Sequence, residues 1–212
     1  TTPETPTTPE TPTTPDKPNN GGGSGGGSSS SISTPAKKGF SDVSTDSYYY
    51  NAVQWAVKLG ITEGKTDTTF APDETCTRAQ MVTFLWRLAG SPKVDSAVNP
   101  FTDVSENAYY YDAVMWAVAN GIVKGVTETT FAPNETVTRS QTVTLLYRNG
   151  SSPAVGGALK FDDVHSEDYY ANAVIWASEK NITNGTSANT FSPKDPCTRG
   201  QIVTFMYRNN VK

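Results

Sequence analysis

One sequence module is repeated three times in this chain. Each copy opens with Phe-x-Asp-Val, carries a tryptophan 15 residues after the phenylalanine, continues through a glycine and Phe-x-Pro, and closes with Thr-Arg-x-Gln. The opening phenylalanines are Phe40, Phe101 and Phe161. Self-similarity at a nearly fixed period is typical of supersecondary units that bury a core only by packing against one another. We therefore expect one folded body with up to three related sites.

The N-terminal segment has a different composition from the repeats. Residues 1–18 are rich in Thr, Pro and Glu, and residues 21–31 are rich in Gly and Ser. Such segments bury too little apolar surface to offset the entropy lost on ordering, so residues 1–39 are predicted to be a disordered linker. A linker at this place also suggests the C-terminal piece of a longer protein, and a Thr/Pro spacer is typical of a tethered extracellular protein. The alternative is an interdomain linker in a cytoplasmic protein. The three repeats are predicted at residues 40–100, 101–160 and 161–212.

Composition narrows the class of function. The formal net charge is −4, and no apolar run approaches the roughly 18 residues that a membrane helix needs, so we expect no nucleic-acid partner and no membrane insertion. Cys76 and Cys197 occupy the repeat position at which the middle copy has Val137. This pattern favours buried free thiols, although an extracellular location would also permit a disulfide. Two cysteines and the distant His165 are no zinc ligand set, and we expect no metal and no cofactor.

Each module is predicted to be a helix, a loop and a second helix. Apolar residues at helical spacing over residues 48–59 predict the first helix of copy one, and Gly60 follows as its C-terminal signal. Thr77 and Gln80 form a capping box, which predicts the start of the second helix. Two helices cannot close a core. The predicted fold is therefore mostly α, with three tandem helix-loop-helix repeats packed as a pseudo-threefold, three-pronged bundle.

The chain's six arginines fall at only two repeat positions. These sets are Arg87, Arg148 and Arg208 near the end of the second helix, and Arg78, Arg139 and Arg199 at its first position. A cation complements the helix dipole at the end but is disfavoured at the start by a few tenths of a kcal/mol or more. Free amides at a helix N-terminus together with a guanidinium would make a seat for a carboxylate or phosphate. The alternative is an ion pair with a nearby Asp, or stacking on an aromatic ring.

Amide and aromatic side chains are further candidates for ligand contact. The motif glutamines adjoin the proposed anion seat, although capping alone accounts for them. The tryptophans either pack in the core or offer a wall on which sugar rings stack. Runs of tyrosine at 48–50, 109–111 and 169–170 add amphipathic aromatic surface. The candidate residues are Gln80, Gln141 and Gln201, and Trp55, Trp116 and Trp176.

A catalytic interpretation finds little support in the sequence. Asp42, Asp103 and Asp163 recur, but a single carboxylate before an apolar run is more typical of a turn or cap residue. A glycosidase needs two converging carboxylates, and no such pair stands out. We therefore predict that the chain is not an enzyme and has no catalytic residues.

Taken together over residues 40–210, these motifs resemble the S-layer homology domain. The resemblance implies a three-pronged helical pseudo-trimer that anchors surface proteins non-covalently to secondary cell-wall polysaccharide, commonly a polymer ending in a pyruvylated amino sugar. It further implies that the family's Thr-Arg-Ala-Glu signature lies in grooves between adjacent modules, with the arginine on the ligand. The matching residues are Thr77-Arg78-Ala79-Gln80, Thr138-Arg139-Ser140-Gln141 and Thr198-Arg199-Gly200-Gln201.

Two departures from the family signature bear on the predicted sites. Gln replaces Glu in all three copies, which keeps the capping box and removes a negative charge beside the anion seat. Gly200 loosens the first turn of its helix by up to roughly 1 kcal/mol relative to Ala, so the third site is the least secure.

The resemblance leads to one functional prediction and one alternative. The predicted partner is secondary cell-wall polysaccharide or another anionic wall glycan, bound by a monomeric pseudo-trimer at the surface of a Gram-positive cell. The alternative is a protein–protein module that helps to assemble a surface layer.

Overall fold

The computed structural model describes residues 39–94 and 98–211 of the chain. Secondary structure in these residues consists of six helices and three isolated bridges between extended residues. This confirms the predicted mostly helical, three-repeat fold. The predicted linker over residues 1–39 lies outside the described residues, apart from Gly39. The helices are α1 (Tyr50–Lys58), α2 (Arg78–Leu88), α3 (Tyr111–Ala119), α4 (Arg139–Asn149), α5 (Ala171–Glu179) and α6 (Arg199–Asn210).

Local signals set both ends of these helices. Thr77 Oγ1 accepts the Gln80 N–H at 3.2 Å, and Gln80 Oε1 accepts the Thr77 N–H at 3.0 Å, so the predicted capping box begins α2. The same box begins α4 and α6. The first helix of copy one ends where Gly60 takes a φ of 68°, and Asn181 takes a φ of 55° at the equivalent place in copy three. Glycine and asparagine adopt this left-handed conformation at lower cost than other residues.

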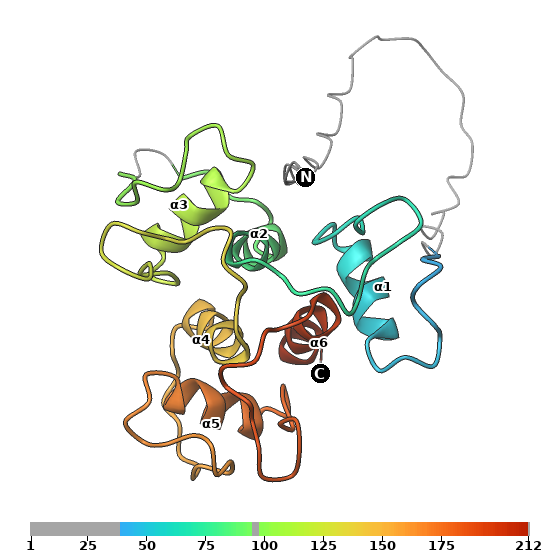
Figure 1. Ribbon diagram of the computed structural model, residues 1–212, viewed down its shortest axis with the longest axis vertical. Helices are drawn as coiled ribbons and strands as arrows, with labels where there is room; N and C mark the ends of the chain where they lie inside the picture. The colour runs from blue at the N-terminus through green and yellow to red at the C-terminus, as the bar shows by residue number, and fades with distance from the viewer. Residues whose placement is uncertain (1–38, 95–97, 212) are drawn as a thin grey trace, which may run out of the picture. The chain divides into compact units, whose positions relative to one another are not determined.

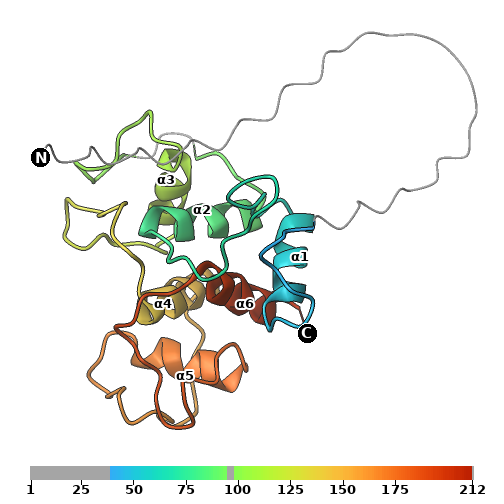
Figure 2. The same cartoon turned by 45° about the vertical axis from the view of Figure 1, so that its right-hand side comes forward.

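The six helices form two sets. Figure 1 shows α2, α4 and α6 grouped together, with α1, α3 and α5 outside them, and the turned view in Figure 2 keeps this arrangement. Each outer helix packs on the inner helix of the preceding repeat: α3 on α2, α5 on α4, and α1 on α6. The last pairing joins the first repeat to the third. Each packed helix pair therefore combines helices from two different repeats, and the three repeats close into a ring.

Three equivalent residues meet at the pseudo-threefold axis. Val137 N–H donates to the Cys76 carbonyl at 2.9 Å, and Cys197 N–H donates to the Val137 carbonyl at 2.9 Å. Cys76 N–H completes the cycle on the Cys197 carbonyl at 3.2 Å. Both thiols are free and fully buried, as predicted. Burial raises the pKa of Cys76 to about 12 and that of Cys197 to about 11.

Each repeat fastens its long loop to the core with a phenylalanine pair. Phe70 is fully buried, and its ring centroid lies 5.8 Å from that of Phe40. Gly64 has a φ of 102° and packs closely against Phe40, so an added Cβ would lie 2.5 Å from Phe40 Cε1. The loop glycine thus supplies the positive φ that this close approach requires, and the buried phenylalanine anchors the loop on the core. The other two repeats have the same arrangement.

Candidate functional site

An aspartate clamps the loop that each repeat presents to its neighbour. Asp103 Oδ1 accepts the Phe131 N–H at 2.8 Å, and Asp103 Oδ2 accepts the Ala132 N–H at 2.7 Å. Ala132 has a φ of 57°, a left-handed conformation that costs a non-glycine residue about 1–2 kcal/mol. The clamp holds the backbone in this conformation. Asp42 and Asp163 make the same two bonds in their repeats, which confirms the predicted turn role.

The clamped loop covers the N-terminus of the preceding repeat's inner helix. Glu135 O accepts the Arg78 N–H at 2.9 Å, and Pro133 O accepts the Ala79 N–H at 3.0 Å. The next amide, the Gln80 N–H, donates to Thr77 Oγ1, so the first three backbone N–H groups of α2 are all hydrogen-bonded within the protein. The loops of copies three and one cover α4 and α6 in the same way. The prediction that these helix N-termini offer free amides to an anion is therefore wrong.

The motif arginines are buried between the repeats. Arg78 Nε donates to the Phe131 carbonyl at 2.9 Å, and the guanidinium carbon lies 4.9 Å from the centroid of the Phe131 ring. Arg139 has the same contacts with Phe191, and Arg199 has them with Phe70. Stacking on an aromatic ring, the alternative raised from the sequence, is therefore confirmed. Burial lowers the pKa of Arg78 and Arg139, but arginine remains charged in proteins.

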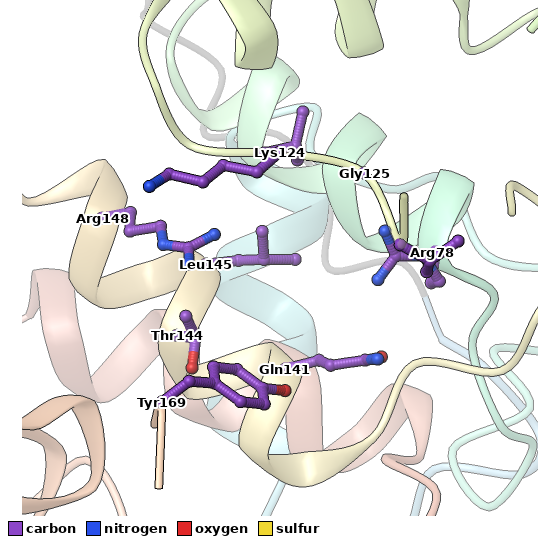
Figure 3. Close-up of a pocket in the computed structure, with 10 residues that line it drawn as sticks. Arg78, Lys124, Gly125, Gln141, Thr144, Leu145, Arg148 and Tyr169 are labelled. Carbon is purple, nitrogen blue, oxygen red and sulfur yellow. The ribbon is translucent and has the colours of Figure 1, made fainter. Parts of the chain in front are cut away.

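A cavity of about 350 Å³ opens beside Arg78. Figure 3 shows the guanidinium of Arg78 facing side chains from α4 across this space. Repeat one contributes Arg78 to the cavity, and repeat two contributes helix α4 and the loop that contains Lys124. Repeat three contributes Tyr169. The residues that matter for ligand chemistry are Arg78, Lys124, Gln141, Leu145, Arg148 and Tyr169.

The cavity has a cationic lining. Arg78, Lys124 and Arg148 contribute three positive charges, and its lining residues, all in the described part of the chain, include no carboxylate. Arg148 is held in place because its Nη1 donates to the Ile122 carbonyl at 3.3 Å. Gln141 uses Oε1 to accept the helix-cap amide, which leaves its side-chain N–H groups to serve a ligand. These groups match an anion that also carries polar oxygens.

The structure brings together some predicted residues and adds others. Arg78 and Gln141, which were predicted as ligand-binding residues in the motifs of two different copies, line one cavity. Sequence reasoning missed Lys124, because the equivalent residues are Glu63 and Asn184 and no repeat pattern marks the position. It assigned Arg148 to the helix dipole and Tyr169 to general aromatic surface. A search for charges next to each loop glycine would have found the lysine.

The tryptophans lie elsewhere, between paired helices. The ring of Trp55 contacts Tyr207 of α6 at a centroid distance of 5.8 Å, and that of Trp176 contacts Tyr147 of α4 at 5.6 Å. Trp116 and Trp176 are only 7% and 5% exposed. This placement matches the core-packing alternative, since the neighbouring helix covers faces that a sugar would need.

A membrane-spanning helix or a metal site would each require a characteristic set of side chains in the described residues. Among them, no helix has both the length and the apolar character that crossing a bilayer requires. No cluster of three or more His, Cys, Asp or Glu side chains suited to a metal ion occurs in the same residues.

Comparison with known proteins places these features in a family. The sequence model of the S-layer homology domain matches residues 39–82, 100–143 and 160–203. The "Surface-layer 125 kDa protein" of Lysinibacillus sphaericus is 33% identical over 165 residues, which cover 76% of this chain and 14% of that protein. The "Cellulosome-anchoring protein" of Acetivibrio thermocellus is 28% identical over 155 residues, covering 69% of this chain and 34% of that protein.

Some relatives are enzymes, but the matching part is small. The "Amylopullulanase" of Thermoanaerobacterium thermosulfurigenes is 28% identical over 176 residues, covering 80% of this chain and 9% of the enzyme. The chain thus spans a minor part of each relative's length, and the shared part is the anchoring module rather than a catalytic one. The family match covers more than half of the chain in three tandem copies, so the chain belongs to the S-layer homology domain family, as a cell-wall-anchoring region that acts at the cell surface.

Proposed function

We propose that this region holds a surface protein on the cell wall by binding an anionic secondary cell-wall polysaccharide between its repeats. The observation that carries the proposal is the cavity in which Arg78, Lys124 and Arg148 supply positive charge without a carboxylate among the lining residues. A wall polymer whose sugars carry carboxylates, such as pyruvate ketals, offers the complementary charge. Polar oxygens of the same sugar would suit Gln141 and Tyr169.

Arg78 is prepared to bind before a ligand arrives. Its Nε is already bonded to the Phe131 carbonyl, and the ring of Phe131 supports its guanidinium. Little side-chain entropy is then lost on binding, which favours affinity. The guanidinium is also buried, and a charge pair is stronger where water is partly excluded. Arg78 would therefore recognise the carboxylate, with Lys124 as a second, more mobile charge.

Tyr169 would contribute the contact to the sugar ring. Its side chain is 65% exposed and lies at the edge of the cavity. An exposed tyrosine offers an apolar face for sugar C–H groups and a hydroxyl for hydrogen bonds. A carboxylate in the cavity and a sugar on Tyr169 would together bind a carboxylated saccharide more tightly than a simple anion.

The direct test is sedimentation of the full chain with purified Gram-positive cell wall, before and after chemical removal of the secondary polysaccharide. We expect binding to be lost on removal. Binding to the untreated wall should also be inhibited by the methyl glycoside of a pyruvylated N-acetylhexosamine, and less by the same glycoside without the ketal. Binding that survives removal would point to peptidoglycan or to a protein partner and would contradict the proposal.

A charge reversal at the cavity tests the mechanism without disturbing the buried arginine. Lys124 is exposed, so Lys124→Glu should leave the fold intact and weaken wall binding at least tenfold. Lys180→Glu is the matched control, because Lys180 is exposed and does not line the cavity. Equal loss in both variants would indicate a non-specific effect of net charge.

A further inference from the structure

The three equivalent grooves share a framework but differ at four of the positions that line the Arg78 cavity. Val123 corresponds to Thr62 and Thr183, and Val126 corresponds to Lys65 and Thr186. The position of Leu145 in α4 is occupied by Phe84 in α2 and by Phe205 in α6. The position of Lys124 is occupied by Glu63 in the first copy and by Asn184 in the third. The motif arginine, the glutamine and the helix-end arginine are the same in all three. Differences in binding between the grooves must therefore come largely from these four positions, and the position of Leu145 alone decides whether a second ring lies beside the arginine.

In two grooves a second aromatic ring takes the space beside the arginine. The guanidinium carbon of Arg139 lies 5.5 Å from the centroid of Phe205, in addition to its contact with Phe191. That of Arg199 lies 5.6 Å from the centroid of Phe84. At these distances the ring quadrupole attracts the cation.

The same two arginines are sealed from solvent at one nitrogen. Nη2 of Arg139 and Nη2 of Arg199 are buried and have no hydrogen-bond partner. A buried N–H group without a partner is costly, and the nearby phenylalanine ring offers partial compensation. These nitrogens therefore present no exposed N–H group to a ligand.

Arg78 is in a different environment. Among the described aromatic rings, Phe131 alone lies within cation–π distance of its guanidinium, because the second ring is replaced by Leu145. The shorter side chain leaves room, and Arg78 and Leu145 both line the open cavity. Figure 3 shows them on facing sides of it. A ligand can thus reach the guanidinium of Arg78 without moving a core side chain.

Charge also favours the Arg78 groove over the other two grooves. The Arg78 groove carries Lys124 beside its loop glycine, which adds a cation where a ligand would enter. The equivalent residue is neutral Asn184 in the Arg139 groove. In the Arg199 groove it is Glu63, and Lys65, which is paired with Glu74, follows the loop glycine there. Of the three loop glycines, only Gly125 has flanking residues with a net positive charge, which attracts an anionic ligand. Space and charge therefore both favour the Arg78 groove.

We infer that the Arg78 groove is the principal site for a carboxylated wall sugar in this chain, and that Phe205 and Phe84 close the other two grooves. This inference rests on the proposed function and assigns it to one of three similar places. It predicts that a pyruvylated N-acetylhexosamine glycoside, titrated into the full chain by calorimetry, binds with a stoichiometry of one. A stoichiometry near three would overturn it.

Exchanging the groove residues tests the assignment in both directions. Leu145→Phe introduces the residue that the other copies carry, and it should weaken binding to polysaccharide-bearing wall at least tenfold. Asn184→Lys with Phe205→Leu, added to Leu145→Phe, should open the Arg139 groove and restore binding to within about threefold of the wild type. Restored binding cannot be explained by damage to the fold.

The outcomes separate the two proposals. If Leu145→Phe retains the wild-type far-UV spectrum and melting temperature and binds the wall normally, the groove assignment is overturned while glycan binding stands. If Leu145→Phe fails to fold, Asn184→Lys with Phe205→Leu in the wild-type background decides, because the inference requires a second bound glycoside. An unchanged stoichiometry in that variant overturns it. If wild-type binding survives removal of the polysaccharide, the proposed function and the groove assignment both fail.

Discussion

The aspartate clamp should contribute a large part of the stability of each repeat junction. Asp103→Asn keeps the shape of the side chain but replaces one acceptor oxygen with an NH2 group that faces a backbone N–H. The two bonds lost or weakened are 2.8 and 2.7 Å long, and hydrogen bonds to a charged group contribute about 1.5–3 kcal/mol each. Since one acceptor survives, we expect the free energy of unfolding to fall by about 2–4 kcal/mol.

The strain at Ala132 provides a second, independent check. Its left-handed φ of 57° costs about 1–2 kcal/mol, and the clamp offsets that cost. Glycine adopts this conformation freely, so Ala132→Gly in the Asp103→Asn background should recover about 1 kcal/mol. If Ala132→Gly lowers stability further in that background, backbone strain is not what the clamp opposes.

The assay is urea unfolding of the full chain, followed by far-UV circular dichroism and tryptophan fluorescence. A lower midpoint with an unchanged m-value reports lost stability. Asp163→Asn removes an equivalent pair of bonds, of 2.8 and 2.7 Å, and should cost a similar amount. Asp46→Asn is the control, because Asp46 is exposed and should change stability by less than about 0.5 kcal/mol. A loss below about 0.5 kcal/mol for Asp103→Asn would refute the reasoning.

Other changes have equally definite expected outcomes. Gly125→Ala should lower the free energy of unfolding in urea by more than about 2 kcal/mol, because the φ of Gly125 is 77° and the new Cβ would meet backbone carbonyl oxygens. Gly121→Ala is the control and should lower it by only about 1 kcal/mol, because Gly121 has a φ of 67° but open space around its Cβ position. Gln141→Glu keeps the capping box and should weaken wall binding several-fold without lowering the melting temperature. The wild type should lose stability as pH rises from about 9 toward 11, because the raised pKa values keep the Cys76 and Cys197 thiols protonated in the folded state while the unfolded chain releases both protons. Replacing both cysteines by Val should flatten this dependence in urea titrations at pH 8–10.5.

Local features of the fold were predictable from the sequence because local chemistry determines them. The capping box starting at Thr77 and the glycine at position 60 involve residues within a few positions of each other, and both occur as predicted. The pairing of α1 with α6 could not be predicted in this way. The outer helices of the three repeats are similar in sequence, so periodicity cannot tell whether one packs on its own repeat or on a neighbour.

The same distinction between local signals and contacts across repeats applies to the candidate site. Arg78 lies at the first position of α2, as its motif predicted, and its role in ligand binding stays a prediction. The predicted anion site at free helix amides was wrong, because the first N–H groups of α2 donate to the carbonyls of Pro133 and Glu135, which lie more than 50 residues away. Such contacts depend on how repeats meet. Lys124 and Leu145 were not predicted, because they differ from their equivalents and only residues shared by the copies form a repeat pattern.

The closed ring explains why a chain with one principal groove would still need three repeats. Arg199 Nε donates to the Phe70 carbonyl, and α1 packs on α6, so the third repeat completes the first. The open groove itself draws Arg78, Lys124 and Tyr169 from three different repeats. Grooves in which phenylalanine covers the arginine gain a second cation–π contact and support the ring. The groove with Leu145 gives up that contact and leaves its arginine accessible to a ligand. If the Arg78 groove is the principal site, stability and binding are divided among copies of one module by the residue at the position of Leu145 together with the charge at the position of Lys124.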